Sequence, residues 1–117
     1  MALTILDGSI GQELVKRSNE EPTGLWSTEV LIRTPNLVLD VHADYFAAGA
    51  DIATSNSYAV HRDRLVRFGI EEQFETLLNA AGQIAVKARD AHGSGQVAGS
   101  IGPAGWSYRP SLAPAEE

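Results

Sequence analysis

The chain has 117 residues, of which 44% are hydrophobic and 21% charged, a composition typical of one small soluble domain with a hydrophobic core. Nine basic and fifteen acidic residues give a formal net charge of −6. This charge argues against a nucleic-acid-binding surface, because such surfaces cluster Lys and Arg.

The sequence has no cysteine, which excludes a disulfide framework, a thiolate metal site and a cysteine nucleophile among its own residues. It lacks the apolar run of about 18 residues that a membrane span needs. Its N-terminus does not resemble a signal peptide, so we expect a cytoplasmic protein.

The first part of the chain is predicted to contain one strand and two helices. Residues 3–6 are apolar and predict a short buried strand that ends at Asp7. A helical pattern follows over residues 10–16. A polar, turn-rich loop then leads to a second short helix, for which Ser27 is the expected N-cap.

The middle of the chain predicts a helix and a second strand. Thr34-Pro35 is typical of a helix start, because threonine can cap free N–H groups and proline loses nothing at the first helical position. Apolar residues then recur at helical spacing from Leu37 to Ala48, and Gly49 is expected to end this helix. Residues 50–55 predict a second buried strand.

The last part of the chain predicts the longest helix and a third strand. A connection with a helical turn near residues 61–67 leads to a helix over residues 70–91, which carries a continuous apolar stripe. The segment 92–95 is glycine-rich and stops this helix. Residues 96–102 predict a third strand, and from about residue 106 we expect an irregular tail.

The order strand, helix, strand, helix, strand indicates an α/β fold with parallel strands and right-handed crossovers. In such sheets binding and catalytic residues gather at the carboxyl ends of the strands. Three small, polar segments follow the predicted strands, namely residues 7–9, 54–58 and 99–103. Their similarity favours a functional site over a purely structural sheet.

The first strand end offers two kinds of binding group. The carboxylate of Asp7 suits an ammonium group or a metal. The N–H groups of Gly8, Ser9 and Ile10 lead into a helix N-terminus, which favours an anion. Together they can hold both ends of an α-amino acid. The competing interpretation is that Asp7 simply caps the following helix.

The second strand end offers hydroxyl groups, an amide and an aromatic ring, which come from Thr54, Ser55, Asn56, Ser57 and Tyr58. A hydrogen-bonded turn explains the same residues equally well. Trp26 is a candidate pocket wall, although a single tryptophan is more often a packing residue. His42 is interpreted as a surface or packing residue, and none of the three histidines has metal-ligand spacing.

Taken in order, four stretches resemble the homocysteine S-methyltransferase family. They are "LDGSIGQEL", "LWSTEVL", "TPNLVLDVHADYFAAGADIATSNSYAV" and "VAGSIGPAG", and they cover nearly all of residues 4–105. The resemblance implies the N-terminal portion of a (β/α)8 TIM barrel, with about three parallel strands and their intervening helices. It also implies methyl transfer to the sulfur of homocysteine, which gives methionine. In this family a zinc ion held by three cysteine thiolates binds that sulfur.

The resemblance assigns binding roles to nine residues of this sequence. Asp7 matches the aspartate that receives the amino group, and the backbone of Gly8, Ser9 and Ile10 matches the carboxylate-binding turn. Trp26, Thr54, Asn56, Tyr58 and Ser100 match the remaining pocket wall. Many relatives have a second glycine where Ser9 stands. No catalytic residue and no metal ligand is carried over.

The family pattern also implies that residues 1–117 form only part of a homocysteine-binding barrel domain. The zinc cysteines lie late in the family's barrel, and a complete barrel has roughly 250 residues. Open sheet edges favour self-association or pairing with a complementary barrel chain. We therefore expect a methyltransferase-like protein that is incomplete and inactive as this chain alone. The alternatives are a non-catalytic α/β module that binds a small molecule or a partner, and a degenerate fragment without activity.

Overall fold

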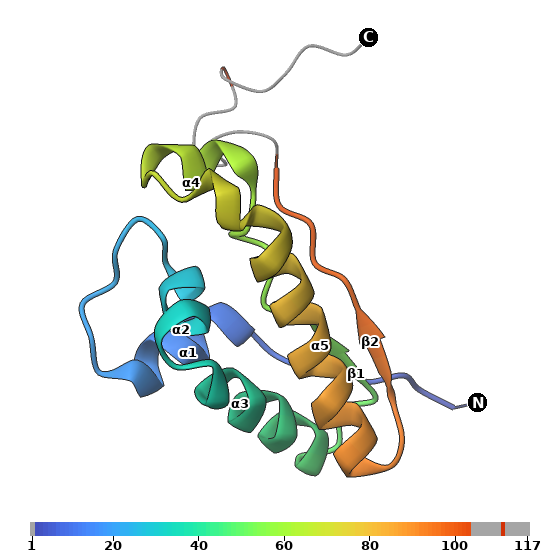
Figure 1. Cartoon of the computed structure of the whole chain (residues 1–117). Helices are drawn as coiled ribbons and strands as arrows, with labels where there is room; N and C mark the ends of the chain where they lie inside the picture. Colours follow the sequence, from blue (N-terminus) through green and yellow to red (C-terminus); the bar gives the residue numbers. More distant parts are fainter. Residues whose placement is uncertain (1, 104–110, 112–117) are drawn as a thin grey trace, which may run out of the picture.

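A computed structural model describes residues 2–103 and 111 of the chain (Figure 1). The described residues form a small parallel sheet with helices packed against it. In chain order the elements are α1 (Ile10–Ser18), α2 (Ser27–Arg33), α3 (Pro35–Ala47), β1 (Ile52–Thr54), α4 (Arg62–Arg67), the 3-10 helix η1 (Glu71–Gln73), α5 (Phe74–His92) and β2 (Gln96–Ala98). The predicted irregular tail from about residue 106 lies outside the described residues, apart from Ser111. None of the described helices is long and apolar enough to cross a membrane.

The sheet of the described residues has two strands, so the prediction of three full strands was wrong in one detail. β1 and β2 run parallel, with Ile52 opposite Gln96. The predicted first strand is reduced to an isolated parallel bridge between Leu6 and Ile52. Leu3 and Leu6 remain 81% and 63% exposed, so this segment is not buried either. Apolar residues alone do not make a buried strand, because burial needs a covering layer that the described residues do not provide here.

Most helix ends follow the sequence signals. Gly49 has a φ of +112° and its N–H donates to the carbonyl of Phe46, while the N–H of Ala50 donates to Tyr45. This pair of bonds is a Schellman motif, so Gly49 ends α3 as predicted. Gly93 takes the left-handed conformation after α5.

Two predicted caps do not form. Thr34 precedes α3 with Pro35 at its first turn, but the threonine side chain makes no capping hydrogen bond. Ser27 is the first residue of α2 rather than its cap, and the cap position is occupied by Trp26. The longest helix also begins later than residue 70, because a 3-10 turn precedes it.

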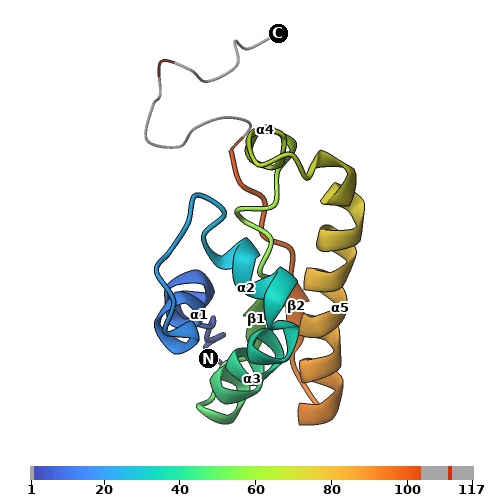
Figure 2. The same cartoon turned by 60° about the vertical axis from the view of Figure 1, so that its left-hand side comes forward.

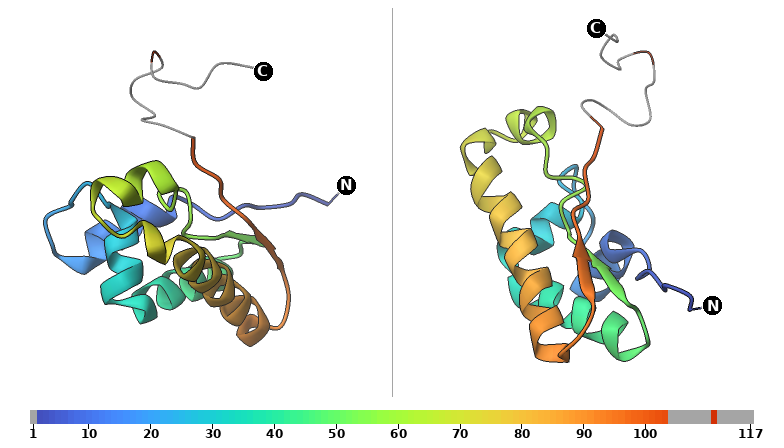
Figure 3. Two further views of the ribbon diagram at one scale, coloured as in Figure 1. Left: turned by 45° about the horizontal axis from the view of Figure 1, so that its top comes forward. Right: turned by 90° about the vertical axis from the view of Figure 1, so that its right-hand side faces the viewer.

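The core is built from residues of all five helices, and within it α3 and α5 pack against each other along much of their length (Figure 2). The buried residues of this main cluster are Leu14, Leu25, Val30, Leu31, Val38, Val41, Val60, Leu65, Leu77 and Ala81. α5 also runs along β2, as Figure 3 shows. The small buried residues Ala81, Ala85 and Ala88 let α5 approach its neighbours closely.

His42 lies in the middle of this core rather than at the surface. Its side chain is fully buried on α3, and neither ring nitrogen has a hydrogen-bond partner among the described residues. Burial lowers the pKa of His42 below its ordinary value of 6.5, while the carboxylate of Asp7 opposes this shift. The interpretation of His42 as a packing residue is therefore the one that fits.

The buried neutral imidazole predicts acid-sensitive stability. The unfolded chain binds a proton at His42 near pH 6.5, whereas the folded chain does so only at lower pH. The unfolding free energy is thus not reduced by protonation of His42 above about pH 6.5, and it decreases as the pH falls toward the folded-state pKa of His42. One such group contributes at most about 1.4 kcal/mol per pH unit over this window. Urea unfolding at pH 7.5 and pH 5.0 measures the loss.

His42→Leu is the matched variant, because it keeps an apolar side chain in the core and removes the titration. We expect a smaller loss of unfolding free energy between the two pH values than in the parent chain. His61 retains part of the dependence, because burial, followed by the Arg64 charge, also lowers its pKa. Equal losses in the parent and in His42→Leu would remove His42 as the cause.

Candidate amino-acid-binding site

All nine predicted site residues line one cleft of about 400 Å³. They come from the segment after the Leu6 bridge, the N-terminal ends of α1 and α2, the end of β1 and the segment after β2. The predicted members are Asp7, Gly8, Ser9, Ile10, Trp26, Thr54, Asn56, Tyr58 and Ser100, and the sequence reasoning missed Leu6, Gly11, Gln12, Ser27 and Ala59. The carboxyl ends of the strands therefore meet around one hollow, as a parallel sheet requires.

The carboxylate of Asp7 binds the end of β1. Its Oδ2 accepts a hydrogen bond from the Thr54 backbone N–H at 2.8 Å, and its Oδ1 accepts one from the Thr54 hydroxyl at 2.8 Å. The N-cap position of α1 is held by Ser9, and both Asp7 oxygens bond to Thr54, so the geometry favours a link between segments over the competing interpretation of Asp7 as the cap of α1. Each carboxylate oxygen retains acceptor capacity beyond its one bond to Thr54.

No cationic side chain of the described residues pairs with Asp7. The ion pairs found among the described residues join other side chains. A half-buried carboxylate next to an empty volume and without a counter-charge suits an ammonium group supplied by a ligand. The geometry is consistent with the ammonium hypothesis for Asp7.

The N-terminus of α1 faces the same cleft. The first intrahelical bond reaches Glu13, whose N–H donates to the Ser9 carbonyl, so the N–H groups of Ile10, Gly11 and Gln12 have no acceptor within the helix. All three residues line the cleft. Free donors and the positive end of the helix dipole favour a carboxylate here.

Tyr45 holds the turn before α1 in place. Its hydroxyl donates to the Ser9 carbonyl at 3.3 Å, and its ring lies so close to Gly8 that an added Cβ would come within 2.7 Å of the hydroxyl. Burial, followed by the Glu13 and Asp7 charges, raises the pKa of Tyr45, which keeps the hydroxyl protonated as a donor. A larger residue at position 8 would therefore have to displace the Tyr45 ring and its bond to the Ser9 carbonyl.

A closed ring of three hydrogen bonds joins the ends of β1 and β2. The Ser57 hydroxyl donates to the Ser100 carbonyl at 2.7 Å, and the Ser100 N–H donates to the Ser55 hydroxyl at 3.1 Å. Because the Ser57 hydroxyl proton is thereby used, the Ser55 hydroxyl donates to Ser57 in the third contact, at 2.7 Å. Ser55 and Ser57 are buried and act as structural links, while Ser100 lines the cleft.

Asn56 and Trp26 connect the second strand end to α2. The buried Asn56 side chain donates to the Ser27 carbonyl at 3.1 Å. Trp26 has a φ of +54° and a ψ of −131°, a conformation that is rare outside glycine. Its indole nitrogen lies opposite Gly11, where an added Cβ would approach within 3.2 Å. Trp26 is 38% exposed, so it forms a wall of the cleft rather than core packing.

Tyr58 and its neighbours form the outer rim of the cleft. The Tyr58 ring is half exposed, and its carbonyl lies so close to Gly102 that any larger residue at 102 would clash with backbone. The N–H groups of Ser57 and Val60 donate to the carbonyls of Ser55 and Ser57, so the segment is also a hydrogen-bonded turn. The two interpretations of this segment are therefore compatible.

The residues of this chain do not fit a thiolate-bound zinc ion. The sequence provides no cysteine. Within residues 2–103, no group of three His, Cys, Asp or Glu side chains gathers as a metal site. The site is a set of hydrogen-bonding groups around one carboxylate, which suits the backbone of a zwitterionic amino acid.

The fold and the cleft define the class: an α/β protein with a parallel sheet and an amino-acid-sized cleft at its strand ends, which is consistent with part of a barrel. The family model described as homocysteine S-methyltransferase matches residues 4–116, and the chain belongs to this family. It is 36% identical over 111 residues to the homocysteine S-methyltransferase of Escherichia coli (strain K12). It is 35% identical over 114 residues to the homocysteine S-methyltransferase YbgG of Bacillus subtilis (strain 168).

Solved structures agree with this assignment. The metallated form of the homocysteine methyltransferase MmuM from Escherichia coli superposes with a TM-score of 0.78 at 35% identity, covering 88% of this chain and 38% of that one. Its oxidized form gives 0.77 at 36% identity and covers 37% of that chain. The chain also spans 36% of the length of each of the two curated relatives. It therefore corresponds to a fraction of those proteins, and the partial barrel predicted from the sequence is consistent with this coverage.

The serine ring predicts a measurable contribution to stability. Ser57→Ala removes one donor and leaves the buried Ser55 hydroxyl without its acceptor, so we expect a loss of about 1–3 kcal/mol in unfolding free energy. Ser94→Ala is the matched control because Ser94 is exposed, and its effect should lie within about 0.5 kcal/mol of zero. Urea unfolding at pH 7.5 compares the three chains, and equal effects of the two variants would contradict a stabilising ring.

Proposed function

We propose that this chain supplies the homocysteine-binding part of a homocysteine S-methyltransferase, an enzyme that transfers a methyl group to the homocysteine sulfur and forms methionine. Family membership and one geometric observation support the proposal. The observation is that the unpaired Asp7 carboxylate and the free N–H groups at the start of α1 face the same cleft. The cytoplasm stays our prediction for its location.

The cleft offers opposite charges to the two ends of an amino acid. The substrate ammonium group binds the Asp7 oxygens, whose positions are fixed by their bonds to Thr54. The substrate carboxylate binds the N–H groups of Ile10 and its neighbours at the α1 N-terminus. This arrangement holds the amino-acid backbone and leaves the side chain with its sulfur directed away from both anchors.

Trp26, Asn56, Tyr58 and Ser100 line the rest of the volume. We assign them to enclosing the substrate and excluding water, because they combine flat apolar surface with hydroxyl and amide groups. The Asn56 side chain is held by its bond to Ser27, so its other hydrogen-bonding groups are available to a ligand in a fixed position. The indole of Trp26 lines the cleft opposite Gly11.

We assign no step of sulfur activation to this chain. A thiol with a pKa near 8.5 is mostly protonated at pH 7, and the thiolate is the nucleophile. The family uses zinc bound by cysteine thiolates for this purpose, and the present sequence contains no cysteine. The chain by itself is therefore proposed to bind homocysteine without methylating it.

The alternative function is a non-catalytic module that binds a small amino acid. The cleft supports binding in both cases, and the donor set of this chain supports no chemistry on the sulfur. The two proposals differ in whether a methyltransferase assembly uses the bound amino acid. Binding and turnover measurements therefore address them separately.

Binding of L-homocysteine measured by calorimetry tests the role of Asp7. Asp7→Asn removes the charge but keeps both contacts to Thr54, because an amide oxygen accepts from the backbone N–H while the amide NH₂ donates to the hydroxyl. We expect affinity to fall about tenfold to a hundredfold, which corresponds to a charge-assisted hydrogen bond.

Asp40→Asn is the matched control, because Asp40 is exposed on α3 and does not line the cleft. It removes the same charge and should leave the affinity unchanged. Equal affinity for Asp7→Asn and the parent chain would take Asp7 out of the ammonium site. An L-amino acid methyl ester as a second ligand should bind more weakly than the free acid if the α1 N–H groups hold the carboxylate.

Turnover by the isolated chain tests whether it binds homocysteine without methylating it. We expect no methionine above the buffer background when the chain is incubated with L-homocysteine and S-methylmethionine, because nothing in it lowers the pKa of the substrate thiol. Mass spectrometry detects the product. Catalytic formation of methionine by the pure chain would show that sulfur activation does not require groups outside it.

A further inference from the structure

The indole of Trp26 lines the cleft without a side-chain anchor. It makes no hydrogen bond within the part of the chain that the structure describes, and the residue is 38% exposed. Its backbone, with a φ of +54° and a ψ of −131°, is in a conformation that persists only where neighbouring groups hold it. The position of the indole therefore depends on the groups that hold the turn before α2.

Thr23 holds this turn from the side of α2. Its carbonyl accepts the Trp26 N–H at 3.0 Å, and its hydroxyl oxygen accepts the Leu25 N–H at 3.2 Å. The same hydroxyl donates to Oε2 of Glu29 on α2 at 3.0 Å. Leu25 is buried in the core, whereas the next residue, Trp26, lines the cleft. The turn thus separates a core residue from a cleft residue.

The helix α4 holds the same turn from the other side, at Gly24. Nη1 of Arg64 donates to the Gly24 carbonyl at 3.3 Å, across 40 residues of sequence. Phe68, which directly follows α4, places the end of its ring against Gly24, where an added Cβ would overlap the ring. The ring is 45% exposed, so it does not belong to the buried core. Its packing against Gly24 is possible because glycine has no side chain.

We propose that Phe68 and Arg64 are positioning residues for the amino-acid site, and that they act through Gly24 on the Trp26 wall. The bond from the Trp26 N–H to the Thr23 carbonyl spans Gly24, so a displacement of Gly24 moves the turn that carries the indole. A wall that is held before the ligand arrives favours binding, because no free energy is then lost in ordering it. The inference rests on the proposed function for the identity of the ligand, but the position of Trp26 can be measured without a ligand.

Fluorescence quenching of Trp26 is the first test. Trp106→Phe in the full chain removes the second tryptophan, which lies outside the described residues, and leaves Trp26 as the single reporter. In this background we expect Phe68→Ala to raise the acrylamide quenching constant about 1.5- to 2-fold, because a wall that moves is more accessible. Arg64→Met removes the bond to Gly24 and should cause a smaller rise. Equal quenching in Phe68→Ala and the parent would overturn the inference.

Gly24→Ala tests whether the effect acts through Gly24. Alone it should raise the quenching constant, because the new methyl group has to displace the Phe68 ring. In the double variant with Phe68→Ala, the methyl group occupies space that the ring has left. The double variant should therefore not exceed Phe68→Ala alone. Additive effects would show that the two residues do not share one contact, which contradicts the inference.

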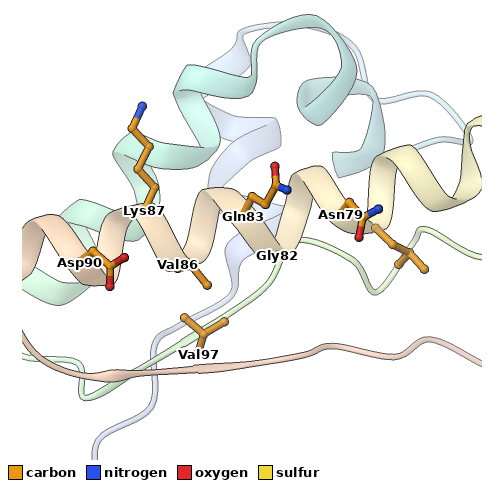
Figure 4. Close-up of a pocket in the computed structure, with 8 residues that line it drawn as sticks. Asn79, Gly82, Gln83, Val86, Lys87, Asp90 and Val97 are labelled. Carbon is orange, nitrogen blue, oxygen red and sulfur yellow. The ribbon is translucent and has the colours of Figure 1, made fainter.

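Val86→Ala is the matched control, because it removes a partly buried apolar side chain outside the turn. Val86 lines a separate hollow of about 570 Å³ between α5 and β2, in which it faces Val97 (Figure 4). We expect its quenching constant to equal that of the parent. The same rise in Val86→Ala and Phe68→Ala would indicate a general loosening of the fold and would remove the special role of Phe68.

Calorimetry with L-homocysteine tests the consequence for binding. We expect the Kd of Phe68→Ala to be about three- to tenfold higher than that of the parent, and the Kd of Val86→Ala to be unchanged. If the parent binds no amino acid, the proposed function fails, while the quenching experiment still decides whether α4 positions Trp26. Increased quenching with an unchanged Kd would overturn the role of Phe68 in binding.

Discussion

The bidentate contact between Asp7 and Thr54 is the interaction on which the site depends. β1 has three residues, and the first segment joins it by one bridge, with backbone bonds from Asp7 to Ile52 and from Asp51 to Ile5. The two bonds from Thr54 to the carboxylate fix the chain at the point where α1 begins. The same carboxylate is the proposed ammonium anchor. One side chain therefore joins two segments that are 47 residues apart and presents a charge to the cleft.

The third strand end is attached by a different device. The ring formed by Ser55, Ser57 and Ser100 closes the gap between β1 and β2 beyond the last ladder bond. Each member donates once and accepts once, so the buried hydroxyl groups are satisfied without a charged group. At both places, between Asp7 and Thr54 and between the ends of β1 and β2, side-chain hydrogen bonds thus hold segments that the short strands do not join by themselves. This explains why small polar residues are concentrated after every strand, a pattern that is visible in the sequence but whose bonding is not.

Helix ends that depend on local chemistry could be predicted from the sequence. Gly49 and Gly93 end their helices because a left-handed residue is cheapest as glycine, and that rule needs no tertiary information. The cleft residues were predictable because parallel strand ends converge, and the family resemblance then selected particular positions. Residues 3–6 were misjudged because the same apolar pattern describes a buried strand and an uncovered one, and only a neighbouring layer distinguishes the two.

Other features could not be seen without tertiary contacts. The burial of His42 depends on how α3 packs in the core, and its own helix gives no sign of it. Trp26 has a positive φ in the turn before α2, and nothing in its residue type predicts this conformation. Ser55 and Ser57 were noticed as polar residues, but their pairing with the Ser100 backbone joins positions more than 40 residues apart.

The serine ring also fixes the segment after β2 in the wall of the cleft. Ser100 lies two residues after the end of β2 at Ala98 and is held by Ser55 and Ser57. Both partners of Ser100 are buried and follow β1, so the two strand ends are joined on the side where the amino acid is proposed to bind. The groups proposed to anchor the amino acid thus lie on a chain without cysteine, so the proposed anchoring does not depend on thiolate ligands for a metal.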